Sequence, residues 1–277
     1  MGSRWGAFLL RLACEPPFRI LARALLGWVN PSIQLRSLFE LSARPHYLLG
    51  VLAGAEQAQR QGLSAMSVFE FGVAGGNGLV ALQAEAEAVE QATGVQIKVY
   101  GFDMGAAGLP EFIGDYRDHP DVWQPGDYPM DEAKLRARLA TRTTLVLGNV
   151  ADTVASFFAE QRPPPVGFVS IDVDLYSSSC DALRIFTSPG SSMLWHVPVY
   201  FDDIDFLFNH RFAGELLAIS EFNAGATDIK IDRWYGVGNG RPFPERHFLN
   251  KMYVAHDLRA GSDQRAPRAR AGLHLQD

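Results

Sequence analysis

The stretch V-F-E-F-G-V-A-G-G-N-G, at residues 68–78, decides the fold of this chain. Residues 68–71 have the apolar composition of a buried strand. A cluster of glycines follows, at Gly72, Gly75, Gly76 and Gly78. Residues 79–91 are rich in Ala, Leu, Gln and Glu, which predicts a helix. A strand, a glycine turn and a helix form the unit that places a ligand at the carboxyl edge of an open α/β sheet.

The spacing of these glycines excludes two common nucleotide motifs. Dinucleotide sites require G-x-G-x-x-G, and phosphate loops require G-x-x-x-x-G followed by Lys and then Ser or Thr. Neither string occurs in the turn, and an acidic residue, Glu70, instead stands two positions before Gly72. This pattern resembles motif I of class I methyltransferases, which bind S-adenosylmethionine. The alternative is a glycine-rich turn of an unrelated α/β protein.

Composition and charge restrict the class of protein further. The chain has 277 residues, 47% of them apolar, which suits one large α/β domain with an extension. A formal net charge of −6 argues against nucleic acid as the partner, because phosphate binding needs a basic surface. Two cysteines are too few for a disulfide framework. We therefore expect a cytoplasmic protein that acts on a small molecule.

The N-terminal segment, residues 6–28, contains two apolar runs that charged residues and paired prolines interrupt. A spanning helix needs about 20 predominantly apolar residues, and Arg11 also breaks the apolar core that a signal peptide requires. We expect no transmembrane segment, and instead a helical arm and cover over residues 1–66. The arm would pack on the domain or on a second copy of the chain, giving a homo-oligomer. The alternative is a basic amphipathic helix on a membrane surface.

Strand and helix patterns alternate over the rest of the chain. Strands are predicted at residues 68–71, 96–102, 143–148, 166–171, 193–201, 228–233 and 251–255. Helices are predicted at residues 32–41, 46–60, 79–91, 131–140, 152–160, 177–186 and 205–222. Such alternation predicts a parallel sheet with right-handed crossovers. The last two strands, which no helix connects, can form an antiparallel pair at one edge.

Two further segments stand apart from this α/β core of residues 67–258. Residues 104–130 form a long stretch rich in Gly, Pro, Asp and aromatic residues, and we interpret it as a flap over the site. Residues 259–277 are polar with few large apolar residues, which indicates a disordered tail.

Polar side chains stand at the carboxyl ends of five of the predicted strands, where ligands bind in open α/β sheets. Besides Glu70 they are Asp103, Asn149, the pair Asp172 and Asp174, and the pair Asp202 and Asp203. Each acid alone could cap a turn or lie in solvent. Together they indicate a site, in which Asp103 would reach the ribose hydroxyls of a nucleoside and Asn149 and Val150 would flank its base.

The carboxylates at the ends of the fourth and fifth predicted strands indicate a cation site. Asp172 and Asp174 lie two positions apart, so on a strand they would point to the same side with Cα atoms about 6.6 Å apart. Asp202 and Asp203 end the neighbouring strand. Carboxylates this close repel one another, and a divalent cation removes that cost. Oxygen ligands favour Mg²⁺, Mn²⁺ or Ca²⁺ over Zn²⁺.

The string I-D-V-D-L-Y-S-S at residues 171–178, with F-D-D at residues 201–203, resembles the macrocin O-methyltransferase family. Its motif I pattern fits Glu70, Gly72, Val73 and Gly76, and Y-G-F-D at 100–103 and G-L-P at 108–110 also fit. The resemblance covers about residues 67–256. It implies a seven-stranded, mostly parallel Rossmann-like methyltransferase sheet with one antiparallel edge strand. It also implies Mg²⁺-dependent methylation of sugar hydroxyls in natural products.

Carried over by position, the resemblance implies that Asp172, Asp202 and Asp203 bind Mg²⁺ or Mn²⁺ and that Asp174 is the general base. Asp172 would also border S-adenosylmethionine. The chain departs from the family pattern at residues 104–107, where Met-Gly-Ala-Ala replaces the usual Ser-Phe-Glu, and at Ile204, where Tyr is usual. These departures put the ribose and flap contacts in question.

Two other functions compete with O-methylation. A nucleotide-dependent oxidoreductase or epimerase would use the same kind of sheet, but the turn spacing and the lack of a Tyr-x-x-x-Lys pair argue against it. A non-catalytic module that binds S-adenosylmethionine is the second alternative. The intact set of four aspartates argues against the loss of turnover.

Overall fold

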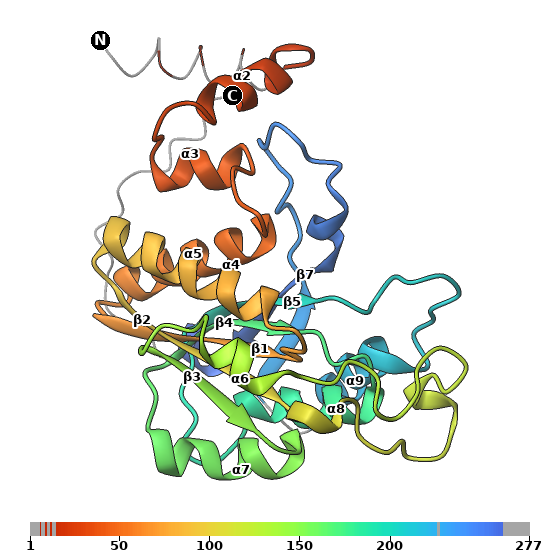
Figure 1. The fold of residues 1–277 in the computed structure, drawn as a ribbon. Helices are drawn as coiled ribbons and strands as arrows, with labels where there is room; N and C mark the ends of the chain where they lie inside the picture. The colour runs from red at the N-terminus through yellow and green to blue at the C-terminus, as the bar shows by residue number, and fades with distance from the viewer. Residues whose placement is uncertain (1–5, 7–8, 10–11, 13–14, 226–227, 263–277) are drawn as a thin grey trace.

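A seven-stranded sheet runs through the centre of the chain, with helices on both faces (Figure 1). The computed structural model describes residues 6, 9, 12, 15–225 and 228–262. The strands are β1 (Ala65–Phe71), β2 (Gln96–Asp103), β3 (Thr143–Leu147), β4 (Val166–Ile171), β5 (His196–Phe201), β6 (Ile229–Arg233) and β7 (Met252–Asp257). Their order in the sheet is β3-β2-β1-β4-β5-β7-β6.

The pairing of the strands confirms the predicted fold class. β1 to β5 are mutually parallel, whereas β7 runs antiparallel to both β5 and β6. The antiparallel strand thus lies one position in from the edge, because the chain reaches β6 first and folds back. The chain moves outward from β1 to β3 on one side and returns to β4 on the other. The carboxyl ends of β1 and β4 therefore form the switch point where ligands bind in open sheets.

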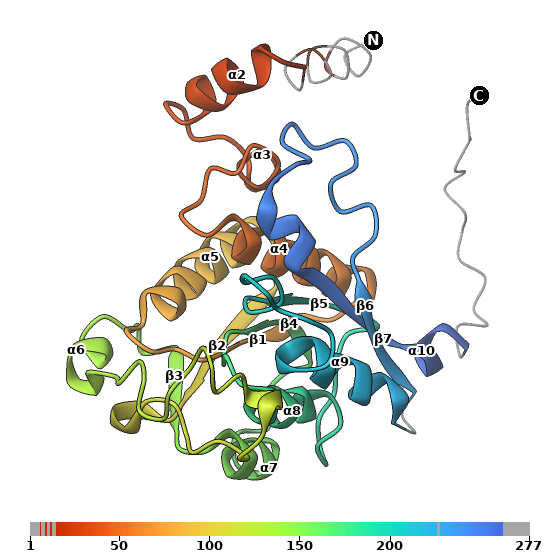
Figure 2. The same cartoon turned by 90° about the vertical axis from the view of Figure 1, so that its right-hand side faces the viewer.

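The helices divide between the two faces. Figures 1 and 2 show α4 (Pro45–Arg60) and α5 (Asn77–Thr93) on one face, and α7 (Val150–Gln161), α8 (Tyr176–Leu183) and α9 (Gly214–Ala224) on the other. The remaining helical segments are α2 (Phe18–Leu26), α3 (Ile33–Leu38), η1 (Gly105–Ala107), η2 (Tyr116–Asp118), α6 (Glu132–Arg136), η3 (Arg184–Phe186), η4 (His247–Lys251) and α10 (Leu258–Ser262).

Aromatic side chains pack the centre of the molecule. Phe157 of α7 stands edge-on to Phe69 of β1 and Phe102 of β2, with ring centroids 5.8 and 5.1 Å apart. Phe71 stacks on Phe102 at 4.8 Å. All four side chains are buried. Edge-to-face and stacked pairs at these distances are favourable, so this cluster fixes β1 and β2 and the turn that follows β1.

The prediction of one helix over residues 205–222 is wrong for its first half. The helix there, α9, begins only at Gly214. The Asn209 side chain donates to the backbone oxygen of Asp203, at 3.0 Å, and Phe208 has φ of +66°. Side-chain hydrogen bonds of this kind hold the backbone in turns and compete with helix formation.

The C-terminal segment differs from its prediction at the start. Leu258–Ser262 forms the short helix α10, where we expected disorder from residue 259. The rest of the predicted tail, residues 263–277, lies outside the described residues.

The helix α2 touches the domain through its arginines and exposes its apolar side. Arg19 donates to the Pro242 oxygen at 2.8 Å and pairs with Glu245 at 2.9 Å, so α2 rests on the connection between β6 and β7. Figures 1 and 2 show this connection rising beside α3. The exposed apolar side chains are Phe18, Ile20, Leu21, Leu25, Trp28 and Val29. Within the described residues, no helix is long and apolar enough to cross a bilayer.

Deletion of residues 1–30 is expected to convert an oligomer of this chain into a monomer. The reason is that the exposed apolar side chains of α2, and Trp28 just after it at 91% exposure, would lose water on packing against a second copy. Light scattering at matched concentration measures the change, and the variant Leu21→Glu with Leu25→Glu should reproduce it. An unchanged oligomer that no longer associates with liposomes would instead support the membrane alternative.

Candidate active site

A cavity of about 450 Å³ lies at the carboxyl edge of the sheet, a volume typical of small-molecule sites. It brings together nearly all the residues that the sequence singled out. The predicted residues that line it are Glu70, Gly72, Val73, Gly76, Asp103, Val150, Asp172, Asp174, Asp202 and Asp203. Asn149 is the exception. It is exposed, and its side chain accepts from the Ala151 amide at 2.9 Å as the cap of α7.

The backbone of the glycine turn after β1 packs closely against the end of β4. Gly72 has φ of +84°, and a side chain there would place its Cβ 1.6 Å from the backbone oxygen of Asp172. The Asp172 amide in turn donates to the Phe71 oxygen at 2.9 Å. Only glycine allows this approach. The turn and the first aspartate of the acidic cluster are therefore fixed relative to each other by the backbone.

The substitution Gly76→Val is expected to weaken S-adenosylhomocysteine binding beyond about 100-fold, through strain and overpacking at the turn. The cause is that Gly76 has φ of +80° and that a Cβ there would stand 2.1 Å from Leu135 Cδ1. Calorimetry measures the affinity.

Gly75→Ala is the matched control for this prediction, because a Cβ at Gly75 meets nothing within 4 Å. It should change the affinity little. A folded Gly76→Val protein with wild-type affinity would show that the turn has only a structural role.

Asp103 holds the glycine turn in place. Its Oδ2 accepts from the amides of Val73 and Ala74, both at 2.8 Å, and its Oδ1 accepts from the Gly105 amide at 2.6 Å. The carboxylate is 9% exposed and lines the cavity. Because a carboxylate oxygen has two acceptor positions, a ribose hydroxyl can still bind here. The ribose contact stays a prediction.

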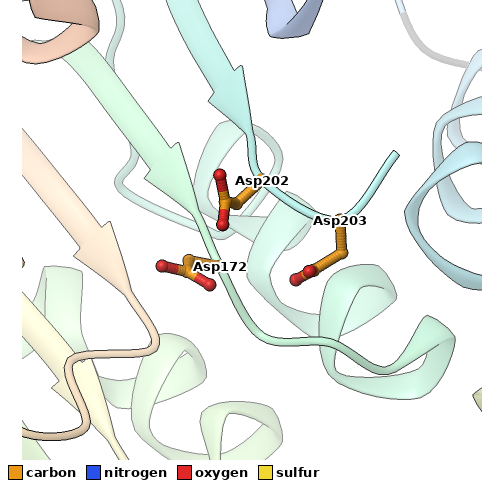
Figure 3. Close-up of side chains that lie close together, drawn as sticks. All are labelled: Asp172, Asp202 and Asp203. Carbon is orange, nitrogen blue, oxygen red and sulfur yellow. The ribbon is translucent and has the colours of Figure 1, made fainter. Parts of the chain in front are cut away.

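Three aspartates converge at the ends of β4 and β5 (Figure 3). One carboxylate oxygen of each of Asp172, Asp202 and Asp203 lies within 4.8 Å of the other two. Asp172 follows β4, and the other two follow β5, its parallel neighbour. Three partly buried carboxylates at this separation are an oxygen donor set for a hard divalent cation.

The residues around these three aspartates compensate their charge only in part. Asp202 accepts from the Tyr200 hydroxyl at 2.6 Å, and Lys251 lies 3.4 Å from the same oxygen. Asp203 donates its backbone amide to Glu215, a fully buried carboxylate, at 2.9 Å. The cluster thus has more acidic than basic groups.

The pKa values of the cluster follow from this imbalance. Burial, and then the charges of Asp203 and Asp202, raise the pKa of Asp172 to about 8. Burial and the charge of Asp202 likewise raise the pKa of Asp203. Burial also acts to raise the pKa of Asp202, but the Tyr200 hydrogen bond and Lys251 outweigh it and lower that pKa. A bound cation would favour the ionised form of all three carboxylates.

Asp174 reaches the cavity by a different geometry from the one predicted. We expected Asp172 and Asp174 to point to the same side of one strand, but β4 ends at Ile171, so this prediction is wrong. Asp174 has φ of +62°, and the Leu175 amide donates across it to the Val173 oxygen at 2.6 Å. This is a tight three-residue turn with a strained central residue. Asp174 is 8% exposed, and burial followed by the charge of Asp203 raises its pKa.

The predicted flap, residues 104–130, does line the cavity. Leu109, Trp123, Asp127 and Tyr128 contribute to its wall. Asp118 anchors the flap, since its buried carboxylate accepts from the amide and hydroxyl of Ser177, at 2.8 and 3.1 Å. These two hydrogen bonds cap the first turn of α8 from outside the helix.

Sequence reasoning missed several residues of the site. Arg44 lines the cavity, and Lys251 and Glu215 contact its aspartates. Lys251 and Glu215 lie in segments predicted only as a strand and a helix, and Arg44 precedes a helix of the predicted cover. No motif marks them, because their role depends on contacts between distant parts of the chain.

Known structures of similar fold include three O-methyltransferases. CalS11, a calicheamicin methyltransferase, is 22% identical, with 76% of this chain and 85% of that chain covered and a TM-score of 0.47. NovP is 17% identical, with 63% and 69% covered and a TM-score of 0.46. TomG from Streptomyces achromogenes, solved with S-adenosylmethionine, is 15% identical, with 85% and 93% covered and a TM-score of 0.43.

The chain matches no protein-family model, and no curated protein matches it. None of the three structures reaches 25% identity or a TM-score of 0.5. The function is therefore inferred from the residues of the cavity itself.

Proposed function

We propose that this chain is an S-adenosylmethionine-dependent O-methyltransferase that uses Mg²⁺ or Mn²⁺ and acts on a hydroxyl of a small molecule. The strongest support is that one cavity contains both a glycine turn and the three carboxylates of Asp172, Asp202 and Asp203 beside Asp174. The glycine turn lacks a phosphate-binding motif. A sugar or natural-product glycoside is the favoured acceptor, because vicinal hydroxyls can chelate a cation.

The residues present fit S-adenosylmethionine. The turn brings its backbone to the cavity without a lysine for phosphate, and Glu70 offers a buried oxygen, Oε2, that has no hydrogen-bond partner among the described residues. Cofactor contacts are assigned to Glu70, Gly72, Val73, Gly76, Asp103, Asn149, Val150 and Asp172. Of these, Asn149 would bind only through a rearrangement of its cap, since its side chain caps α7 and is not part of the cavity lining.

The residues also fit a divalent cation. Asp172, Asp202 and Asp203 supply three oxygen ligands, and the set contains neither His nor Cys, which favours Mg²⁺ or Mn²⁺. When bound, the cation would act as a Lewis acid that lowers the pKa of a coordinated hydroxyl.

In the reaction, Asp174 would take the proton of the acceptor hydroxyl as the oxygen attacks the methyl carbon. The cofactor supplies that methyl group on a sulfonium, which is already activated toward displacement. The chain's own contribution is to hold the acceptor in line and to exclude water. Trp123 and Tyr128 of the flap line the cavity beside Asp174 and can contact the acceptor. Alignment of this kind can contribute roughly 7–11 kcal/mol.

Calorimetry with S-adenosylhomocysteine, with and without Mg²⁺, tests the proposal before any acceptor is known. We expect binding of the nucleoside and a separate, saturable binding of the cation. Tight binding of NAD with no binding of S-adenosylhomocysteine would instead support an oxidoreductase or epimerase. A panel of glycosides and catechols then separates an enzyme from a non-catalytic binding module, which would bind the cofactor without turnover.

A further inference from the structure

Arg44 stands directly before α4 and lines the same cavity as the glycine turn. Its guanidinium group is half-buried, and its Nη1 donates to the Tyr47 hydroxyl at 3.3 Å. Among the described residues, no carboxylate lies within ion-pair distance, 4.0 Å, of this guanidinium. The charges of Glu70, Asp172 and Asp202 act on Arg44 only from beyond that distance. The planar fork of Arg44 is therefore free to pair directly with an anionic group of a ligand in this cavity.

Glu70 lies next to Arg44 through the same tyrosine. The Tyr47 hydroxyl donates to Glu70 Oε1 at 2.8 Å, while Oε2 is buried and has no partner among the described residues. Glu70 is 1% exposed and lines the cavity. One hydroxyl thus joins a cationic donor and a carboxylate with a free oxygen. Such a pair complements a zwitterion, whose carboxylate and ammonium groups are attached to one carbon.

The glycine turn itself offers no charged group to such a ligand. Its polar side chain, Asn77, lines the cavity but is uncharged, and its Oδ1 already accepts from Arg138 at 2.8 Å. Arg44 is therefore the cation best placed for an anionic group that enters beside the turn. Its planar fork can donate two parallel hydrogen bonds to a carboxylate.

We propose that Arg44 binds the α-carboxylate at the amino-acid end of S-adenosylmethionine, and that the free oxygen of Glu70 accepts from the α-ammonium group. This inference rests on the proposed function, and it assigns the recognition of the amino-acid end to a residue outside the glycine turn. Arg44 acts here as a specificity residue for binding, without a part in proton transfer.

Two ligands that differ in this one end test the assignment. S-adenosylhomocysteine carries the amino acid, whereas 5′-methylthioadenosine keeps the adenosine and the sulfur and lacks it. Arg44→Gln should weaken S-adenosylhomocysteine binding by about 10- to 100-fold, which is the loss of a charge-assisted hydrogen bond or pair of bonds. The affinity for 5′-methylthioadenosine should stay within about 2-fold, since that ligand never meets Arg44.

Two further variants control the experiment. Arg138→Gln removes an arginine that touches the turn from outside, at the Gly75 oxygen and Asn77, and that does not line the cavity. It should leave the affinity ratio of the two ligands unchanged. Arg44→Lys keeps the charge and loses the fork, so it should give an intermediate loss for S-adenosylhomocysteine alone. The melting temperature without ligand shows whether each variant is folded.

The outcomes separate this inference from the proposed function. If Arg44→Gln lowers the affinity for both ligands equally, or for neither, then Arg44 does not bind the α-carboxylate. In that case the inference is wrong, while the proposed function stands. If the wild-type protein binds neither ligand, the proposed function itself fails. A loss confined to S-adenosylhomocysteine supports the assignment, because a change in the shape of the turn would affect both ligands.

Discussion

Asp174→Asn is expected to lower the turnover rate by about 10²- to 10⁴-fold, roughly 3–5 kcal/mol, while leaving the affinity for S-adenosylhomocysteine nearly unchanged. Asparagine has almost the same size as aspartate and tolerates positive φ, so the turn at φ +62° should persist. What is lost is the proton acceptor beside the acceptor hydroxyl. The measurement is turnover with the first active glycoside or catechol, at saturating substrate and cofactor.

Excess Mg²⁺ should not restore the activity of Asp174→Asn, because the three cation ligands are intact. Asp181→Asn provides the matched control, since Asp181 lies on α8 nearby and does not line the cavity. It should retain wild-type turnover. If Asp174→Asn turns over normally, the general base is another group and the role assigned to Asp174 is wrong.

Asp203→Asn is expected to weaken Mg²⁺ binding by about 10- to 100-fold, because a charged ligand becomes neutral. The asparagine oxygen can still accept from the Asp174 amide, a bond of 3.2 Å in the wild type, so the local backbone should hold. Turnover should fall at low Mg²⁺ and recover in part at high Mg²⁺. Asp172→Asn and Asp202→Asn should behave in the same way, and EDTA should abolish wild-type activity.

Calorimetric titration of Mg²⁺ follows this prediction without an acceptor. Asp121→Asn is the control, because Asp121 is an exposed flap residue outside the cavity lining. The response to excess Mg²⁺ separates the two sets of variants. Excess Mg²⁺ should partly restore turnover in the variants of Asp172, Asp202 and Asp203, and it should not restore turnover in Asp174→Asn. Activity that survives EDTA, together with silent substitutions at all four aspartates, would rule out the metal-dependent mechanism.

The predictions from sequence succeeded for the acidic residues that lie at the ends of strands. Glu70, Asp103, Asp172 and Asp202 each lie within one residue of the end of a strand, and parallel strands bring their carboxyl ends to one edge. Local composition therefore predicted both the sheet and the residues of the cavity. The flap was predicted for a similar reason, since a long segment without regular structure rarely occurs in a compact domain unless it covers a site.

The failures share a different cause. The turn at Asp174, the late start of α9 and the cap that Asp118 supplies to α8 all depend on contacts between segments that sequence patterns treat separately. Periodicity predicts a strand or a helix from its own residues. It cannot show that a carboxylate 59 positions away will satisfy the amide of Ser177.

The sequence by itself determined the sheet, its glycine turn and the carboxylates at its edge, because a buried strand and the polar residues that end it are local properties. Only the tertiary structure decided which groups surround those carboxylates. Tyr47 joins Glu70 across 23 positions, and Lys251 reaches Asp202 across 49. Burial and the distances between charges set the pKa of each carboxylate and the ligands it can bind, and both arise only when the chain folds.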